Sequence, residues 1–218
     1  EAEEFIQRCM VEREFGPAGE RIVIEQRLVG QECSIIGVTD GENLVPLVPS
    51  QDHKRIGHGD TGDNTGGMGC YSPVPAVDED TFRTCVEGFL KPTIRAMAAE
   101  GTPYTGTVYG GMILPETGPE ILEYNCRFGD PETQVIMPRL KSDLAELLVA
   151  TVEGGLGGIQ LEWSEEVCVC VVLASGGYPG RYEKGKPITG IEEAEQDDKV
   201  VVFHAGTARR DGQLVSNG

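Results

Sequence analysis

Residues 121–127 have the sequence ILEYNCR, whose alternation of apolar and polar side chains predicts a β-strand with two different faces. One face carries Glu123, Asn125 and Arg127, and the residues between them, such as Tyr124, point the other way. Oxygen ligands two residues apart suit Mg²⁺, which also binds phosphate oxygens. A guanidinium beside them can hold a phosphate by paired hydrogen bonds. The pattern indicates a metal and phosphate site, and a solvated edge strand is the alternative.

A second feature is the segment 51–72, which is rich in Gly, Asp, Thr and Asn and predicts a long binding loop. The glycines of 59–69 allow consecutive backbone N–H groups to converge on an anion, and Lys54 and Arg55 add positive charge just upstream. A flexible surface loop is the alternative interpretation. The match of 57–62 to G-x-G-x-x-G is not a dinucleotide fingerprint, because no helix-forming sequence follows it.

A third, weaker feature is the run 24–28, which predicts a strand that leads into a connector. Such a strand can present backbone groups to an adenine edge, and the carboxylate of Glu32, seven residues after Glu25, can accept ribose hydroxyls. Glu25 and Glu32 can equally be ordinary surface acids.

Composition excludes several classes of protein. The chain of 218 residues has 36 acidic and 18 basic side chains, a net charge of −18, which argues against binding to nucleic acid or to an anionic membrane. No apolar run is long enough for a membrane helix. The seven cysteines form no CxxC pair, which favours reduced thiols in a cytosol-like compartment. The scattered histidines argue against a zinc site.

Hydrophobic periodicity predicts both helices and strands. Helices are expected at 2–15, from Asp78 to Gly101 with a kink at Pro92, and from a Ser142 cap to Gly154. Strands are expected at 21–28, 33–39, 44–50, 105–114, 120–125, 167–173 and 200–203. Residues 29–32 should connect the first two strands as a hairpin. The fold class is therefore α+β.

Together with 51–55, 60–73, 123–134, 138–143 and 174–180, these features resemble the ATP-grasp ligases, specifically the glycinamide ribonucleotide synthetase (phosphoribosylamine–glycine ligase) family. The resemblance covers essentially the whole chain. It implies a partial ATP-grasp fold, an antiparallel sheet with flanking helices, at 1–157. A small, incomplete, β-rich C-terminal domain would follow at 158–218.

The resemblance also implies an activity. ATP would convert the carboxylate of glycine into glycyl phosphate, which the amine of 5-phosphoribosylamine would attack, giving glycinamide ribonucleotide, ADP and phosphate in cytoplasmic purine biosynthesis. No covalent protein nucleophile is needed. By similarity, the residues involved would be Glu25, Leu28 and Glu32 for ATP, Glu123 and Asn125 for Mg²⁺ or Mn²⁺, Arg127 for the transferred phosphoryl group, and Lys54, Asn64, Thr65, Gly66 and Gly67 for the other substrates.

The resemblance covers only part of the family's length, which adds one expectation, and two alternative functions remain. We expect a fragment that is truncated at both ends, lacks the N-terminal part of the parent enzyme, binds Mg-ATP weakly and is inactive alone. The alternatives are an inactive nucleotide-binding or scaffold fragment and another ATP-grasp carboxylate–amine ligase. Both are tested by whether Glu123, Asn125 and Arg127 lie near Glu32 and the 64–69 loop.

Overall fold

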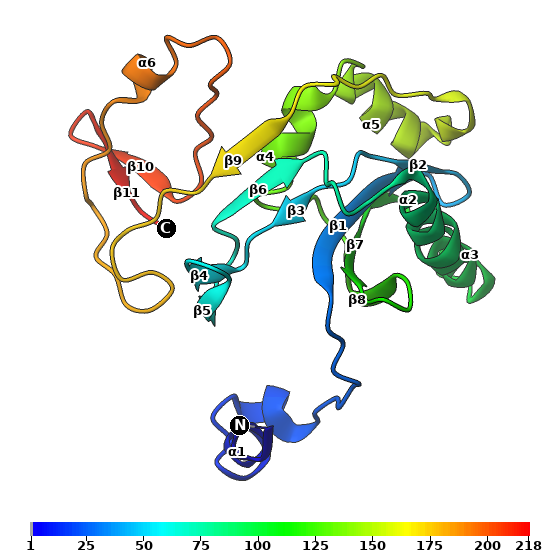
Figure 1. The fold of residues 1–218 in the computed structure, drawn as a ribbon, viewed down its shortest axis with the longest axis horizontal. Helices are drawn as coiled ribbons and strands as arrows, with labels where there is room; N and C mark the ends of the chain where they lie inside the picture. Colours follow the sequence, from blue (N-terminus) through cyan, green and yellow to red (C-terminus); the bar gives the residue numbers. More distant parts are fainter. Residues whose placement is uncertain (1) are drawn as a thin grey trace.

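A computed structural model describes residues 2–218, and its centre is a four-stranded antiparallel sheet with the order β2-β1-β7-β8 (Figure 1). Its strands are β1 (Gln31–Thr39), β2 (Leu44–Pro46), β7 (Gly106–Leu114) and β8 (Glu120–Asn125). Residues 40–43 connect β1 to β2, and residues 115–119 connect β7 to β8 as an antiparallel hairpin. The predicted α+β class with an antiparallel sheet is confirmed.

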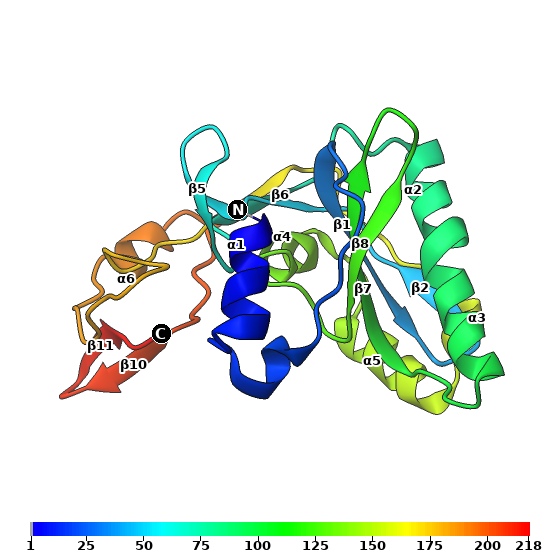
Figure 2. The same cartoon turned by 90° about the horizontal axis from the view of Figure 1, so that it is seen from below.

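One face of this sheet packs against a long helix (Figure 2). The helix comprises α2 (Glu79–Cys85), a π-helical turn (Val86–Leu90) and α3 (Lys91–Ala99). Asp78 caps it as predicted, because its carboxylate accepts a hydrogen bond from the backbone N–H of Thr81 at 2.8 Å. The expected irregularity near Pro92 is the π-helical turn just before it. Ile35, Leu90 and Met112 form the core on this side.

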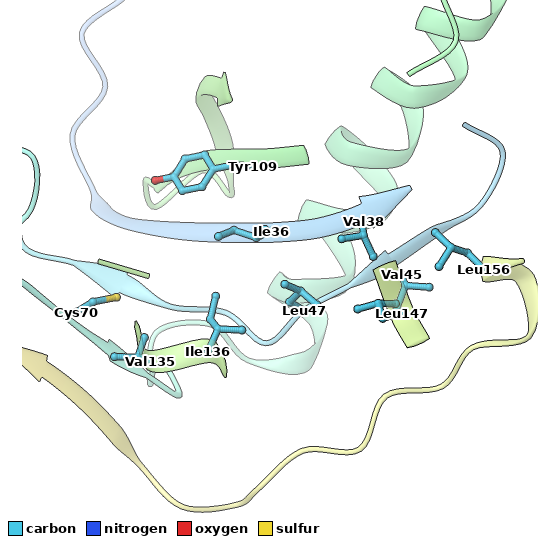
Figure 3. Packing of buried hydrophobic residues seen from close by; sticks show 10 residues of the cluster. All are labelled: Ile36, Val38, Val45, Leu47, Cys70, Tyr109, Val135, Ile136, Leu147 and Leu156. Carbon is cyan, nitrogen blue, oxygen red and sulfur yellow. The ribbon is translucent and has the colours of Figure 1, made fainter. Parts of the chain in front are cut away.

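The opposite face of the sheet covers a second core, shown in Figure 3, to which Ile36, Leu47 and Leu147 contribute. The elements on this side are β3 (Gln51–Asp52), β6 (Gly69–Ser72), α4 (Thr133–Ile136), the 3₁₀ turns Met137–Arg139 and Leu156–Gly158, α5 (Leu144–Glu153) and β9 (Cys168–Val171). Strands β3, β6 and β9 pair into a second antiparallel sheet.

The remaining elements lie at the two ends of the chain and in one hairpin. They are α1 (Ala2–Ile6), a π-helical turn (Gln7–Val11), a 3₁₀ turn (Gly16–Glu20), β4 (Arg55–Gly57), β5 (Thr61–Asn64), α6 (Ile191–Ala194), β10 (Thr207–Arg210) and β11 (Gln213–Ser216). The first helical segment thus ends at Val11, before the predicted Phe15. The β10–β11 hairpin turns at Asp211-Gly212. Asp-Gly is a turn signal, but neither strand of this hairpin was predicted from the sequence.

Two predicted strands are wrong. Residues 21–28 form an extended, largely exposed segment, in which the side chains of Val23 and Ile24 are 84% and 79% exposed. The 29–32 hairpin is therefore absent, because β1 pairs with β2 and β7 instead. Residues 200–203 are also without strand pairing. β-Branched residues favour strands only where a neighbouring strand and a packing surface are present.

Three further predictions need correction. The segment 51–72 is not one loop, because it contains β3, β4, β5 and β6. The strand predicted at 167–173 exists but is shorter and half-exposed: Cys168 and Cys170 pack on the core, whereas Val169 and Val171 are 66% and 72% exposed. The residue that caps α5 is Asp143 rather than Ser142, since the Asp143 carboxylate accepts from two backbone N–H groups of the first turn.

The part of the chain that the structure describes contains no helix with the length and apolar character needed to cross a membrane.

Candidate active site at the polar end of the central sheet

The strand register brings Glu123 onto the same face of the sheet as Ser34 of β1. Ser34 pairs with Gly111, and Gly111 pairs with Glu123, so the three residues lie in one row across β1, β7 and β8. Residues directly opposite one another in a sheet share a face. Asn125 pairs with Tyr109 and therefore points to the same side.

A β-bulge in β8 makes this arrangement possible. Ile121 pairs with Met112 and Glu123 with Gly111, so Leu122 is the extra residue between two consecutive partners. The bulge lets Ile121 pack into the helix-side core while Glu123 points to the opposite face. A strict alternation of side chains would have put Ile121 and Glu123 on one face.

Gly111 leaves space for the Glu123 side chain. A Cβ atom on Gly111 would lie only 3.0 Å from Cγ of Glu123. Within residues 2–218, no hydrogen bond engages the Glu123 carboxylate or the Asn125 side-chain amide, so their oxygens are available to a ligand.

Lys54 forms an ion pair at the start of β1. Its Nζ lies 2.9 Å from Oε2 of Glu32. Burial lowers the pKa of Lys54, but the hydrogen bond to Glu32 and the negative charges of Asp52, Glu32 and Glu123 outweigh burial and raise it. Of the residues predicted from the sequence, Glu32 and Lys54 therefore form an ion pair, and the charge of Glu123 acts on Lys54.

A buried network around Glu132 was missed by the sequence analysis. Glu132 is 3% exposed, and its Oε1 accepts hydrogen bonds of 2.9 Å from the hydroxyls of Ser34 and Tyr109. Burial, followed by the negative charge of Glu132, raises the pKa of Tyr109. The sequence Gly129-Asp130-Pro131 is a turn signature, but burial of the Glu132 carboxylate that follows it depends on long-range packing.

Asp52 is a second residue that was missed. Burial, followed by the negative charge of Glu132, raises the pKa of Asp52 to about 6, although Lys54 acts in the opposite direction. Asp52 thus adds a carboxyl group that titrates close to neutral pH beside the Glu32–Lys54 pair.

The raised pKa of Asp52 predicts a pH-dependent stability. The folded chain binds this proton more tightly than the unfolded chain, so this carboxyl lowers the free energy of unfolding as the pH rises from about 4 to about 6. We expect Asp52→Asn to remove this decline, so that the stability of the variant relative to the parent increases over that range and then levels off. Thermal unfolding at pH 4, 5, 6 and 7 measures the difference, and parallel curves would contradict the assignment.

The glycine-rich loop, residues 64–69, lies against the turn that follows β8. The backbone N–H and the hydroxyl of Thr65 donate to the carbonyl of Lys54 at 2.6 and 2.8 Å. Gly67 has a φ of +117°, and a Cβ atom there would lie 2.4 Å from Cδ of Pro131. The close approach and the positive φ both require glycine at this position.

Within residues 2–218, the other predicted residues make no hydrogen bond or ion pair with the side chains of Glu32, Lys54 or Glu123. The guanidinium of Arg127, beyond the end of β8, donates to the carbonyl of Phe128 at 2.8 Å and is exposed. Asn64 and Gly66 are exposed. Glu25 is exposed and Leu28 half-buried on the extended segment before β1, and within residues 2–218 their backbone groups make no hydrogen bond.

The donor set limits the kind of metal site that this surface can form. Among residues 2–218, no three His, Cys, Asp or Glu side chains are grouped so as to bind a metal ion. The half-buried amide of Asn125 and the carboxylate of Glu123 supply two oxygen donors. Mg²⁺ commonly takes one or two protein oxygens and completes its octahedron with phosphate and water, so the residues present fit such an ion.

The comparisons with solved structures agree with this architecture. A crystal structure of phosphoribosylamine–glycine ligase from Thermotoga maritima matches with a TM-score of 0.75 and 38% identity, over 89% of this chain and 47% of that one. A biotin carboxylase–βγ-ATP complex from Campylobacter jejuni matches with a TM-score of 0.52 and 16% identity, over 75% of this chain and 34% of that one. At this identity the second match shows only that the fold is ATP-grasp.

Sequence comparisons are more specific. The phosphoribosylamine–glycine ligases of Vibrio cholerae and Rhodopirellula baltica are 50% and 49% identical over 219 residues, with 100% of this chain covered. The chain spans about half the length of these curated relatives, 51% and 50%. Family models for the phosphoribosylglycinamide synthetase ATP-grasp (A) domain and C domain match residues 1–133 and 168–218. The chain therefore belongs to the phosphoribosylglycinamide synthetase family.

Proposed function

We propose that this chain is the part of an ATP-dependent ligase that joins glycine to 5-phosphoribosylamine in purine biosynthesis, through a glycyl phosphate intermediate. The observation that carries the proposal is the grouping of Glu32, Lys54 and Glu123 at the polar end of an ATP-grasp sheet, beside a glycine-rich loop. The names of the relatives supply the substrate class.

The nucleotide would bind along the start of β1. The free backbone groups of Glu25 and Leu28 are suited to an adenine edge, and the Glu32 carboxylate to ribose hydroxyls. Glu32 would then exchange its bond to Lys54 for the ribose. Both side chains are partly exposed, so separating this pair costs about 1 kcal/mol or less.

Glu123 and Asn125 would hold Mg²⁺ or Mn²⁺, which when bound neutralises charge on the phosphates. Arg127 would leave its exposed bond to the Phe128 carbonyl and steady the transferred phosphoryl group. Lys54 and the loop residues Asn64, Thr65, Gly66 and Gly67 would bind glycine and phosphoribosylamine.

The reaction would need positioning and charge rather than a protein nucleophile. A glycine carboxylate oxygen bonds to the terminal phosphorus of ATP as ADP leaves. The amine nitrogen then bonds to the acyl carbon as phosphate leaves, and the nitrogen loses a proton. Lys54, whose raised pKa keeps it charged, would stabilise the negative charge that develops on these oxygens.

We further propose a domain boundary near 157/158, with an ATP-grasp domain before it and a β-rich C-terminal domain after it. The family models leave 134–167 unassigned. Strand β9, from the second domain, would then extend the β3–β6 sheet of the first.

The test is an ADP-release assay of the full-length protein with ATP, glycine and phosphoribosylamine. We expect ADP release to require both glycine and the amine. ADP release that persists without glycine, or that favours another amine, would support a different ATP-grasp ligase. A full-length protein that releases no ADP would support a scaffold role.

A further inference from the structure

Tyr178 reaches across the molecule to the glycine-rich loop. The backbone N–H of Gly66 donates a hydrogen bond of 2.9 Å to the hydroxyl oxygen of Tyr178, 112 residues away in sequence. Gly66 lies in the segment matched by the ATP-grasp model, and Tyr178 in the segment matched by the C-domain model. The contact therefore joins the two matched parts of the chain at the loop proposed to bind substrate.

The pairing of β9 with β6 brings Tyr178 to this place. Gly69 pairs with Val171, and the N–H of Val172 donates to the carbonyl of Met68 at 3.0 Å, so the chain after β9 passes beside the loop. A turn then forms in which the N–H of Tyr178 donates to the carbonyl of Ser175 at 3.1 Å.

A second aromatic ring supports the Tyr178 side chain. The ring of Tyr182 packs edge-on against it, with centroids 5.9 Å apart and an interplanar angle of 62°. This arrangement is favourable for aromatic pairs and restricts the orientation of the Tyr178 ring.

The neighbours of Gly66 are held by other parts of the chain. Thr65 bonds to the carbonyl of Lys54, Gly67 packs on Pro131, and the N–H of Met68 donates to the carbonyl of His53 at 2.7 Å. Gly66 is exposed at the top of the loop, and within residues 2–218 its N–H has only the Tyr178 hydroxyl as a partner.

We propose that Tyr178 is a positioning residue: its hydroxyl fixes the orientation of the Gly66 peptide and so the shape of the loop that receives the amine substrate. This inference rests on the proposed function. It gives the C-terminal part of the chain a role in acceptor binding, because that part carries the group that holds the loop. Within residues 2–218, no hydrogen bond joins Tyr178 to the side chains of Glu32, Glu123 or Asn125, so the ATP half of the site should not depend on it.

Tyr178→Phe in the full-length protein tests the proposal, since it removes the hydroxyl and keeps the ring. We expect KM for the two substrates assigned to the loop, phosphoribosylamine and glycine, to rise roughly three- to tenfold, the range for loss of one hydrogen bond, while KM for ATP and the unfolding temperature stay unchanged. Amide hydrogen exchange at Gly66 should become faster. Tyr182→Phe is the matched control and should leave all these values at the parent level.

Two results would overturn the proposal. One is a Tyr178→Phe enzyme with parental KM for phosphoribosylamine and unchanged exchange at Gly66. The other is an equal change in KM for all three substrates together with a lower unfolding temperature, which indicates a general structural role. Failure of the proposed function is distinct, because the parent protein itself would then show no glycine-dependent ligation.

Discussion

Glu123→Gln in the full-length protein is expected to lower kcat/KM for ligation by about 10²- to 10³-fold, the range for removing one group that stabilises developing charge. The amide keeps the size and one oxygen of the side chain but loses the negative charge that attracts a divalent cation. Because Glu123 is exposed at the edge of the sheet and no hydrogen bond within residues 2–218 engages its carboxylate, the fold should not change. ADP release measured across a range of Mg²⁺ concentrations gives both the rate and the metal dependence.

Glu120→Gln is the matched control, because Glu120 is an exposed acid on the same strand, on the other side of the bulge. It should retain parental activity and the parental Mg²⁺ requirement. If Glu123→Gln also retained parental kinetics, the metal site proposed on β8 would be wrong, and a scaffold role for this strand would be favoured.

Glu132→Leu is expected to lower the free energy of unfolding by about 2–4 kcal/mol, since each buried hydroxyl that loses its acceptor costs about 1–3 kcal/mol and the two hydroxyls can still bond to each other. The substitution leaves the hydroxyls of Ser34 and Tyr109 buried without their shared acceptor. It also frees the turn that ends at Pro131, on which the glycine-rich loop packs. Urea denaturation of the full-length protein measures the loss.

Glu132→Gln distinguishes the hydrogen bonds from the charge, because the amide keeps a carbonyl acceptor for the two hydroxyls. We expect it to be destabilised by about 1–2 kcal/mol, in line with the weaker bonds of a neutral acceptor. The variant should also lower the pKa of Asp52, since the charge of Glu132 is one of the causes that raise it. Equal stability of the parent and the Glu132→Leu variant would show that the buried network does not stabilise the fold.

The strands and helices that could be predicted from the sequence are those marked by a local pattern of residue types or by a capping residue. The β-rich runs 33–39, 105–114 and 120–125 predicted β1, β7 and β8, and Asp78 predicted the start of the long helix. The apolar run 21–28 has the same local signature and is not a strand, because no neighbouring strand pairs with it in the described structure. A high strand propensity means that a residue packs well in a paired sheet, but a strand forms only where a neighbouring strand is available to pair with it.

The residues of the candidate site likewise fall into those predicted from the sequence and those revealed only by the fold. Glu32, Lys54 and Glu123 were predicted from residue type and motif, and the structure brings them together. Asp52 and Glu132 were not predicted. Their importance comes from burial and from the effect of the Glu132 charge on Asp52, and neither property leaves a periodic pattern in the sequence.

The sequence by itself determined the α+β class and which side chains of 123–127 could carry chemistry, because residue type and local alternation are written along the chain. Its long motifs also resembled the family to which the chain belongs. Only the tertiary structure decided that a bulge at Leu122 puts Glu123 on the sheet face of Ser34, that Glu132 is buried against Ser34 and Tyr109, and that Tyr178 meets Gly66. These contacts depend on strand register and on packing between residues as far as 112 positions apart. The free energy that selects them comes from burying surfaces that are adjacent only after folding.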